Sequence, residues 1–273
     1  MRRLVTAVVV AAMMSLSGCG RQVTGLNLPQ GGAGIVPVGQ TLIRFETAGP
    51  LDFQNLTYLI VFNTSGNGLQ PYSQGYNTDF RNWSAFFIVG GGAGFANAPS
   101  LLQVYQDPSS GSAKTFNVSV PQGTLTFQTS IPTANAQFGF QITFNRCLLD
   151  LVPPTTTSQP PISVNRVCPP YQAIATDWRV SLFTLDRTQS PVDSLGTTGP
   201  NDTSYTFGFD TALDVNTNFF KPASNNVVQN LSAQIVGIEV FSTPANGSVS
   251  APSPNPSASP STAPTAMPTR APV

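Results

Sequence analysis

The first cysteine of the chain, Cys19, stands where its sulfur is placed for chemical modification. Two arginines, Arg2 and Arg3, are followed by an apolar run over residues 4–14, and small residues come just before Cys19. A positive start, an apolar stretch and small residues are the marks of a secretory signal. The apolar run of about a dozen residues falls short of the roughly 20 that a membrane-spanning helix needs. The segment therefore predicts export and cleavage, with a thiol at the cleavage point.

The residues Leu16-Ser17-Gly18-Cys19 resemble the lipobox of bacterial lipoproteins, in which a leucine and two small residues precede a cysteine. The resemblance implies that the Cys19 sulfur receives a diacylglyceryl group by thioether formation, and that a signal peptidase cuts between Gly18 and Cys19. Buried acyl chains contribute about 0.8 kcal/mol per CH₂, so two or three of them would hold the protein on a membrane. The alternative is an ordinary cleaved signal with an incidental cysteine. In the lipoproteins of two-membrane bacteria that this motif resembles, an aspartate after the cysteine indicates retention at the inner membrane. Gly20 follows Cys19 here, so the resemblance favours the outer membrane or the cell surface.

The other two cysteines, Cys147 and Cys168, are expected to form a disulfide. Outside the cytoplasm two remaining thiols are typical of a bridge. The segment between them is rich in proline and threonine, and it offers little to a hydrophobic core. Closing this loop would stabilise the fold by roughly 3 kcal/mol on the chain-entropy account. The alternative is two reduced, buried cysteines.

Composition excludes several kinds of chemistry and partner. The chain has no histidine, which excludes Ser-His-Asp and Cys-His catalysis and histidine-ligated zinc. Charged residues make up only 9% of the chain, and the only lysines are Lys114 and Lys221. No basic stripe is present, so nucleic acid is not an expected partner. We expect no cofactor and no metal.

Carboxylates give no catalytic pair in the sequence. Glu46 and Glu239 are the only glutamates, far apart in the chain, whereas a glycosidase needs two carboxyl groups that face each other across a cleft.

Two further motifs are weak. Asp214-x-Asn216-x-Asn218 begins like a calcium loop, but Phe219 and Asn225 stand where the glycine and the bidentate glutamate belong. A turn rich in Asn, Asp and Thr is the favoured interpretation. The glycine-rich stretch from Val89 to Phe95 lacks a following helix for phosphate binding, so it predicts a turn between strands.

Aromatic residues cluster with polar ones between residues 70 and 84. Tyr72, Tyr76 and Trp83 lie among Asn, Asp and Arg residues, and aromatic faces beside planar polar groups suit sugar binding. These three residues are the candidate ligand patch. The favoured alternative is that Trp83 and Phe80 enter the core where the next strand begins.

The elements that must position these residues are predicted to be strands. Short stretches rich in Val, Ile, Thr, Phe and Tyr alternate with Gly, Asn, Asp, Pro and Ser, and no long stretch has a helical apolar period. The stretches are residues 41–47, 56–63, 84–90, 114–120, 124–130, 138–145, 177–186, 204–210 and 233–241. Many strands without crossover helices predict an all-β fold, an antiparallel β-sandwich of immunoglobulin-like or jelly-roll-like type. Residues 224–234 could hold one short helix.

Four zones follow from composition. Residues 1–18 are the signal peptide, 19–36 a glycine-rich tether carrying the lipid, 37–243 one β-sandwich domain, and 244–273 a tail of Pro, Ser, Ala and Thr. The tail has too little apolar bulk to offset backbone entropy and is predicted to be disordered.

These observations predict a lipid-anchored, extracytoplasmic, non-catalytic binding or structural protein. Its expected partners are the membrane and a polysaccharide or surface protein. The alternative is a carbohydrate-binding module, or a carbohydrate-active enzyme that uses Asp or Glu without histidine.

Overall fold

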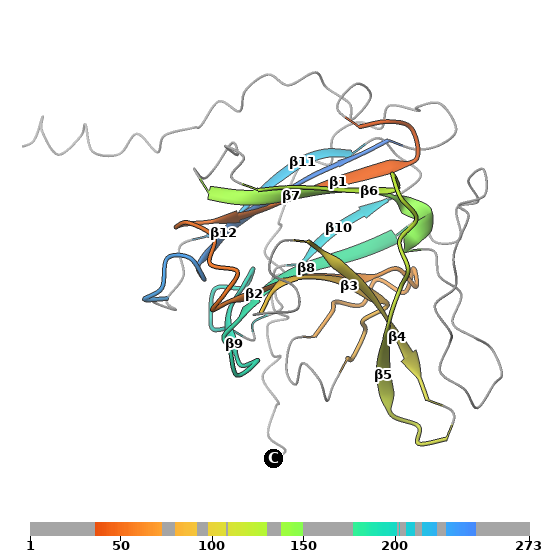
Figure 1. Ribbon diagram of the computed structural model, residues 1–273, viewed down its shortest axis with the longest axis horizontal. Coiled ribbons are helices and arrows are strands. Elements are labelled where there is room, and N and C mark those ends of the chain that lie inside the picture. Colours follow the sequence, from red (N-terminus) through yellow and green to blue (C-terminus); the bar gives the residue numbers. More distant parts are fainter. Residues whose placement is uncertain are drawn as a thin grey trace, which may run out of the picture.

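The computed structural model describes residues 36–72, 80–91, 98–107, 109–129, 138–149, 177–200, 202, 206–210, 215–222 and 228–243. Two antiparallel sheets pack face to face (Figure 1). The predicted antiparallel β-sandwich is therefore confirmed. No helix within these ranges has the length and apolar character needed to cross a bilayer.

The five-stranded sheet has the order β11-β12-β1-β7-β6. Its strands are β11 (Val215–Phe220), β12 (Ile235–Ser242), β1 (Gln40–Thr47), β7 (Phe138–Asn145) and β6 (Leu125–Thr129). A short 3₁₀ turn, η1 (Arg146–Leu148), follows β7.

The seven-stranded sheet has the order β10-β8-β2-β3-β4-β5, and β9 pairs with β8. Its strands are β10 (Phe207–Asp210), β8 (Asp177–Leu185), β2 (Thr57–Asn63), β3 (Ala85–Gly90), β4 (Ser100–Gln106), β5 (Ala113–Asn117) and β9 (Pro191–Ser194).

The main core lies between the sheets. Alternate residues of β1, including Ile43 and Phe45, point into it, as do Phe140 and Ile142 of β7. Rings from both sheets meet there, with Phe45 of β1 edge-on to Tyr58 of β2 at 5.5 Å between centroids. Since side chains alternate across a strand, the residues between these must lie on the outer face of the five-stranded sheet.

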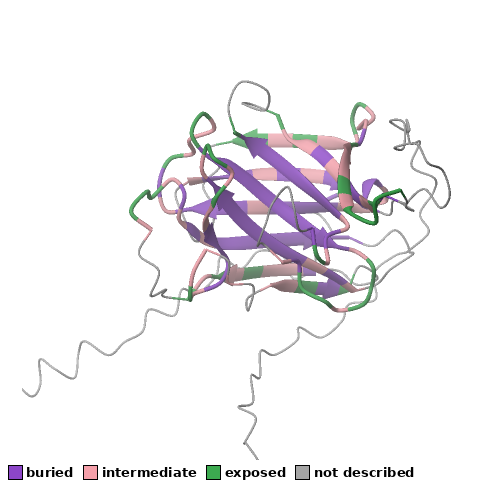
Figure 2. Cartoon of the chain, turned by 90° about the horizontal axis from the view of Figure 1, so that it is seen from below, coloured by how far each residue is buried: buried purple, intermediate pink, exposed green. Residues whose placement is uncertain are grey.

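The central strands of the seven-stranded sheet are buried on both faces. Every residue of β2 and β3 is buried (Figure 2), which explains their continuous apolar sequences. The second face carries its own apolar cluster, which includes Phe80 and Trp83. The prediction that these two aromatic residues enter the core is confirmed.

The described part of the sandwich begins and ends at one corner. The Gly39 N–H donates to Thr243 O at 2.9 Å, and Thr243 Oγ1 donates to Val36 O at 3.3 Å. Beside them Arg146, fully buried, donates from Nε and Nη2 to Ser242 Oγ at 2.9 and 2.7 Å. The chain thus enters β1 and leaves β12 at the same place.

Two expectations about local structure were wrong. Residues 215–220, predicted as part of a polar turn, form strand β11, which pairs along its whole length with β12. Residues 228–234, where a short helix was considered, are a turn in the structure rather than a helix. In the first case cross-strand hydrogen bonds outweighed the turn preference of Asn and Thr.

Candidate functional site

A row of polar side chains crosses the outer face of the five-stranded sheet, one from each strand. The strand register aligns them side by side, in the order Asn218, Glu239, Arg44, Gln141 and Gln128. Because neighbouring strands lie about 4.8 Å apart, the row extends for about 19 Å. We call this set the polar row.

Hydrogen bonds join the middle of the polar row. Arg44 Nη1 donates to Glu239 Oε2 at 2.5 Å, and Arg44 Nε donates to Gln141 Oε1 at 3.0 Å. Gln141 Nε2 reaches Gln128 Oε1 at a longer 3.5 Å. The planar groups therefore hold each other in fixed orientations, and a ligand would meet side chains that have already lost rotamer freedom.

Burial differs along the polar row and fixes its electrostatics. Glu239 is 1% exposed, whereas the Arg44 side chain is 21% exposed and Gln128 is exposed. The Arg44 guanidinium also lies 5.4 Å from the centre of the buried Phe241 ring. The buried carboxylate balances the charge of Arg44, so the row presents donors and acceptors without a net charge.

Glu46, the other glutamate, lies on the same outer face. It pairs in register with Gly237 on β12 and Gly139 on β7, which makes it the diagonal neighbour of Glu239. Diagonal pairs on adjacent strands are about 7–8 Å apart. The sequence alone could not show this proximity, because it depends on the register of β1 against β12.

Burial argues against a hydrolytic role for this pair of glutamates. Glu46 is 0% and Glu239 1% exposed, whereas the acid and base of a glycosidase must line a cleft that admits the sugar. Glu239 also holds Arg44 in an ion pair. The arrangement orients the polar row rather than exposing two carboxyl groups to a substrate.

The predicted aromatic patch does not form a sugar platform through Trp83. Trp83 is 6% exposed, and its ring stacks on Phe183 with an interplanar angle of 3°. Its indole Nε1 donates to the backbone oxygen of Tyr72 at 2.5 Å, and Tyr72 lies under Arg81. Trp83 is therefore not part of an exposed aromatic patch, because its ring packs on the apolar outer face of β3 and β8. Tyr76 lies outside the described residues.

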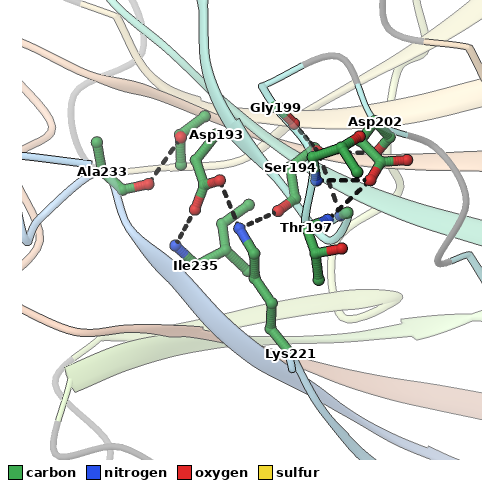
Figure 3. Close-up of polar contacts among 11 residues, drawn as sticks. Asp193, Ser194, Thr197, Gly199, Asp202, Lys221, Ala233 and Ile235 are labelled. Atoms are coloured by element: carbon green, nitrogen blue, oxygen red, sulfur yellow. Dashed lines mark hydrogen bonds and ion pairs between the residues drawn. The ribbon is translucent and has the colours of Figure 1, made fainter. Parts of the chain in front are cut away.

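A second polar cluster lies inside the sandwich, between the two sheets (Figure 3). Lys221 Nζ contacts Asp193 Oδ1 at 2.5 Å and donates to Ser194 O at 2.7 Å. The Ile235 N–H donates to Asp193 Oδ2 at 2.8 Å. Burial raises the pKa of Asp193 above its usual value, although Lys221 and the backbone N–H groups act against the rise. Sequence reasoning missed this cluster, since nothing in the sequence aligns β9 with the end of β11.

The remaining candidate residues are placed as follows. Asn216 and Asn218 lie on β11, Asp214 lies outside the described residues, and within the described ranges no three His, Cys, Asp or Glu residues gather as a metal site. Cys147 lies in η1. Cys19 and Cys168 fall outside the described residues, so the anchor and the disulfide stay predictions.

Comparison of the chain with models of protein families, with curated proteins and with solved structures found no match.

Proposed function

We propose that this chain is a lipid-anchored binding module outside the cytoplasm, held on a membrane through Cys19. The lipobox-like residues Leu16 to Cys19 support the anchor. The corner formed by Val36 and Thr243 supports attachment at one end of the sandwich, because the tether and the tail would both leave the sandwich at that point. The rest of the sandwich surface then stays free of the connections to the anchor.

The binding face of this module is the polar row, and its ligand is a neutral polysaccharide. The observation that carries this proposal is the hydrogen-bonded series from Glu239 through Arg44 and Gln141 to Gln128. Planar amides and a guanidinium offer paired donors and acceptors to sugar hydroxyls. The internal ion pair removes the charge that would favour an anionic ligand.

Length and exposure also favour a chain-like ligand. The polar row runs across five strands for about 19 Å, which suits several consecutive sugar units better than a single small molecule. Phe220, 44% exposed, lies on the same face two residues after Asn218. Its ring offers apolar area to the C–H face of a sugar.

Affinity electrophoresis of the mature chain carrying Cys19→Ser tests the binding proposal. The gels contain a soluble β-glucan, a mannan or pullulan, with dextran sulfate as the anionic comparison. We expect retardation by at least one neutral polysaccharide. The double change Gln128→Ala, Gln141→Ala removes two hydrogen-bonding side chains and should weaken binding roughly tenfold.

Gln106→Ala is the matched control, because Gln106 is exposed on β4 of the other sheet. It should bind as the unsubstituted chain does. If no neutral polysaccharide retards the protein, or if the double variant is retarded equally, the polar row is not the binding face. The first of these results would favour a purely structural role on the membrane.

A further inference from the structure

The two lysines of the chain are each paired with an aspartate, in opposite environments. Lys114 contacts Asp107 at the surface, where 51% of the lysine side chain is exposed. Lys221 contacts Asp193 in the interior, where the two side chains are 5% and 0% exposed. A buried ion pair loses most of its hydration free energy, and the attraction between the two charges offsets this loss only when the geometry is good. The burial of Lys221 and Asp193 is therefore costly, which raises the question of what role the pair has in the interior.

The atoms of the interior pair are arranged as reactants. Lys221 Nζ lies 2.5 Å from Asp193 Oδ1. Since a carboxyl C–O bond is about 1.2 Å long, Nζ is at most about 3.7 Å from Asp193 Cγ, close to the about 3–3.5 Å of a near-attack arrangement. The opposite oxygen, Oδ2, accepts a hydrogen bond from the Ile235 N–H (Figure 3). Ser194 O holds the amine from its other side.

We propose that Lys221 and Asp193 condense to an amide, which makes them the site of an intramolecular isopeptide bond. A proton passes from Nζ to Asp193 Oδ1, which leaves a neutral amine and a neutral carboxyl group. Nζ then attacks Cγ, the C–Oδ1 bond breaks, and Oδ1 leaves as water with a second proton from Nζ. The products are one Nζ–Cγ amide and one water, so no oxidant, reductant or added reactant is needed.

The surroundings favour each part of this step. Exclusion of water disfavours the charged carboxylate, and burial raises the pKa of Asp193 accordingly. The Ile235 N–H points at Oδ2, where negative charge develops when Nζ adds to Cγ, so it acts as an oxyanion donor. Leu195, two residues after Asp193, and Ile235, whose N–H reaches Asp193, are both at most 1% exposed and belong to the core. The surface pair of Lys114 and Asp107 has no comparable shielding from water.

The bond would join the two sheets covalently. Asp193 belongs to β9, which pairs with β8 of the seven-stranded sheet, and Lys221 follows directly after β11 of the five-stranded sheet. The link would close a loop from residue 193 to residue 221 and restrict the unfolded chain as a disulfide does. It would hold the sheets together at the end opposite the corner at Val36 and Thr243.

Peptide mapping of the purified full chain tests the proposal. Chymotrypsin is the suitable protease, because Tyr205, Phe207, Phe209, Phe219 and Phe220 lie between the two residues. Trypsin would leave both in one peptide, since Arg187 and Arg270 are its nearest sites and Lys221 precedes proline. We expect one joined species that contains the Asp193 and Lys221 peptides and is lighter than their sum by one water.

Variants separate this bond from other losses of water. Lys221→Arg keeps the charge but cannot form the amide, and its two peptides should run apart at full mass. Lys114→Arg is the matched control and should keep the joined species. Asp193→Asn should join with loss of ammonia instead of water. Separate Asp193 and Lys221 peptides at full mass in the unsubstituted chain would overturn the proposal, and this result does not depend on whether any variant folds.

Discussion

At the scale of single residues, buried polar groups in this sandwich find partners far away in the chain. The Tyr58 hydroxyl donates to Ser232 O at 3.1 Å and accepts from the Asp52 N–H at 2.9 Å. It thereby connects the start of β2 to the turn before β12, which belongs to the other sheet. Burial raises the pKa of Tyr58 to about 12. The neutral phenol is therefore part of what holds the two sheets together.

The shift gives a prediction for stability at high pH. The unfolded phenol ionises near pH 10, whereas the folded phenol stays neutral until about pH 12. Tyr58 thus contributes stability that is fully present below pH 10 and is lost as the pH rises through 12. Between pH 9 and pH 11 the unsubstituted chain should lose about 1 kcal/mol more unfolding free energy than Tyr58→Phe. Urea unfolding of both proteins at the two pH values measures the difference, and equal losses would contradict the assigned pKa.

A motif of consecutive residues could be recognised in the sequence, whereas contacts between distant residues could not. The lipobox-like motif could be recognised because its four residues are consecutive. The proximity of Glu46 to Glu239 and the contact between Asp193 and Lys221 could not be predicted. Each depends on which strands become neighbours and in what register. The sequence allowed Trp83 to be either in an exposed ligand patch or in the core. The apolar outer face of β3 and β8, which the sequence alone does not show, decides for the core.

At the scale of elements, the strands with regular apolar patterns were predictable. β1 alternates around Ile43 and Phe45, and β7 spans the same eight residues that the sequence indicated. Three strands were missed: β9 is short and begins with proline, β11 is rich in Asn and Thr, and β4 has two adjacent leucines that interrupt a regular alternation. Their backbone groups pair because a neighbouring strand is already in place, so the cause lies outside their own sequence.

The junction after β7 carries a prediction at this scale. Cys147 lies in η1, directly after Arg146, whose side chain donates to Ser242 at the end of β12. A bridge from Cys147 to Cys168 would attach the following segment to this fixed point. The double change Cys147→Ser, Cys168→Ser should then cost roughly 2–5 kcal/mol of unfolding free energy.

A thiol assay checks the bridge independently of stability. The oxidised chain carrying Cys19→Ser should show no free thiol after denaturation and two after reduction. Two thiols before reduction would exclude the bridge and leave both cysteines as small core residues. The serine variant measured beside Cys147→Ala, Cys168→Ala separates loss of the bridge from the burial of a hydroxyl group.

At the scale of the whole molecule, the ends of the described chain bear on where the proposed anchor attaches. Gly39, Thr243 and Val36 meet at one corner, where the described chain enters and leaves the fold. Residues 20–35 then connect this corner to Cys19. The proposed anchor would therefore carry the polar row and the interior Lys221–Asp193 pair on a sandwich attached at this corner.

The anchor itself gives the last prediction. Cys19→Ser removes the only sulfur that the lipobox-like motif offers for acylation, so the variant should leave the membrane fraction or stay unprocessed. Fractionation of cells that produce each variant, followed by mass spectrometry of the amino-terminal peptide, measures both outcomes. The unsubstituted chain should begin at an acylated Cys19. Cys147→Ser is the matched control, because it changes a thiol within the sandwich and should remain with the membrane. An unmodified Cys19, or an amino terminus at another residue, would contradict the anchor and leave the sandwich as an ordinary exported domain.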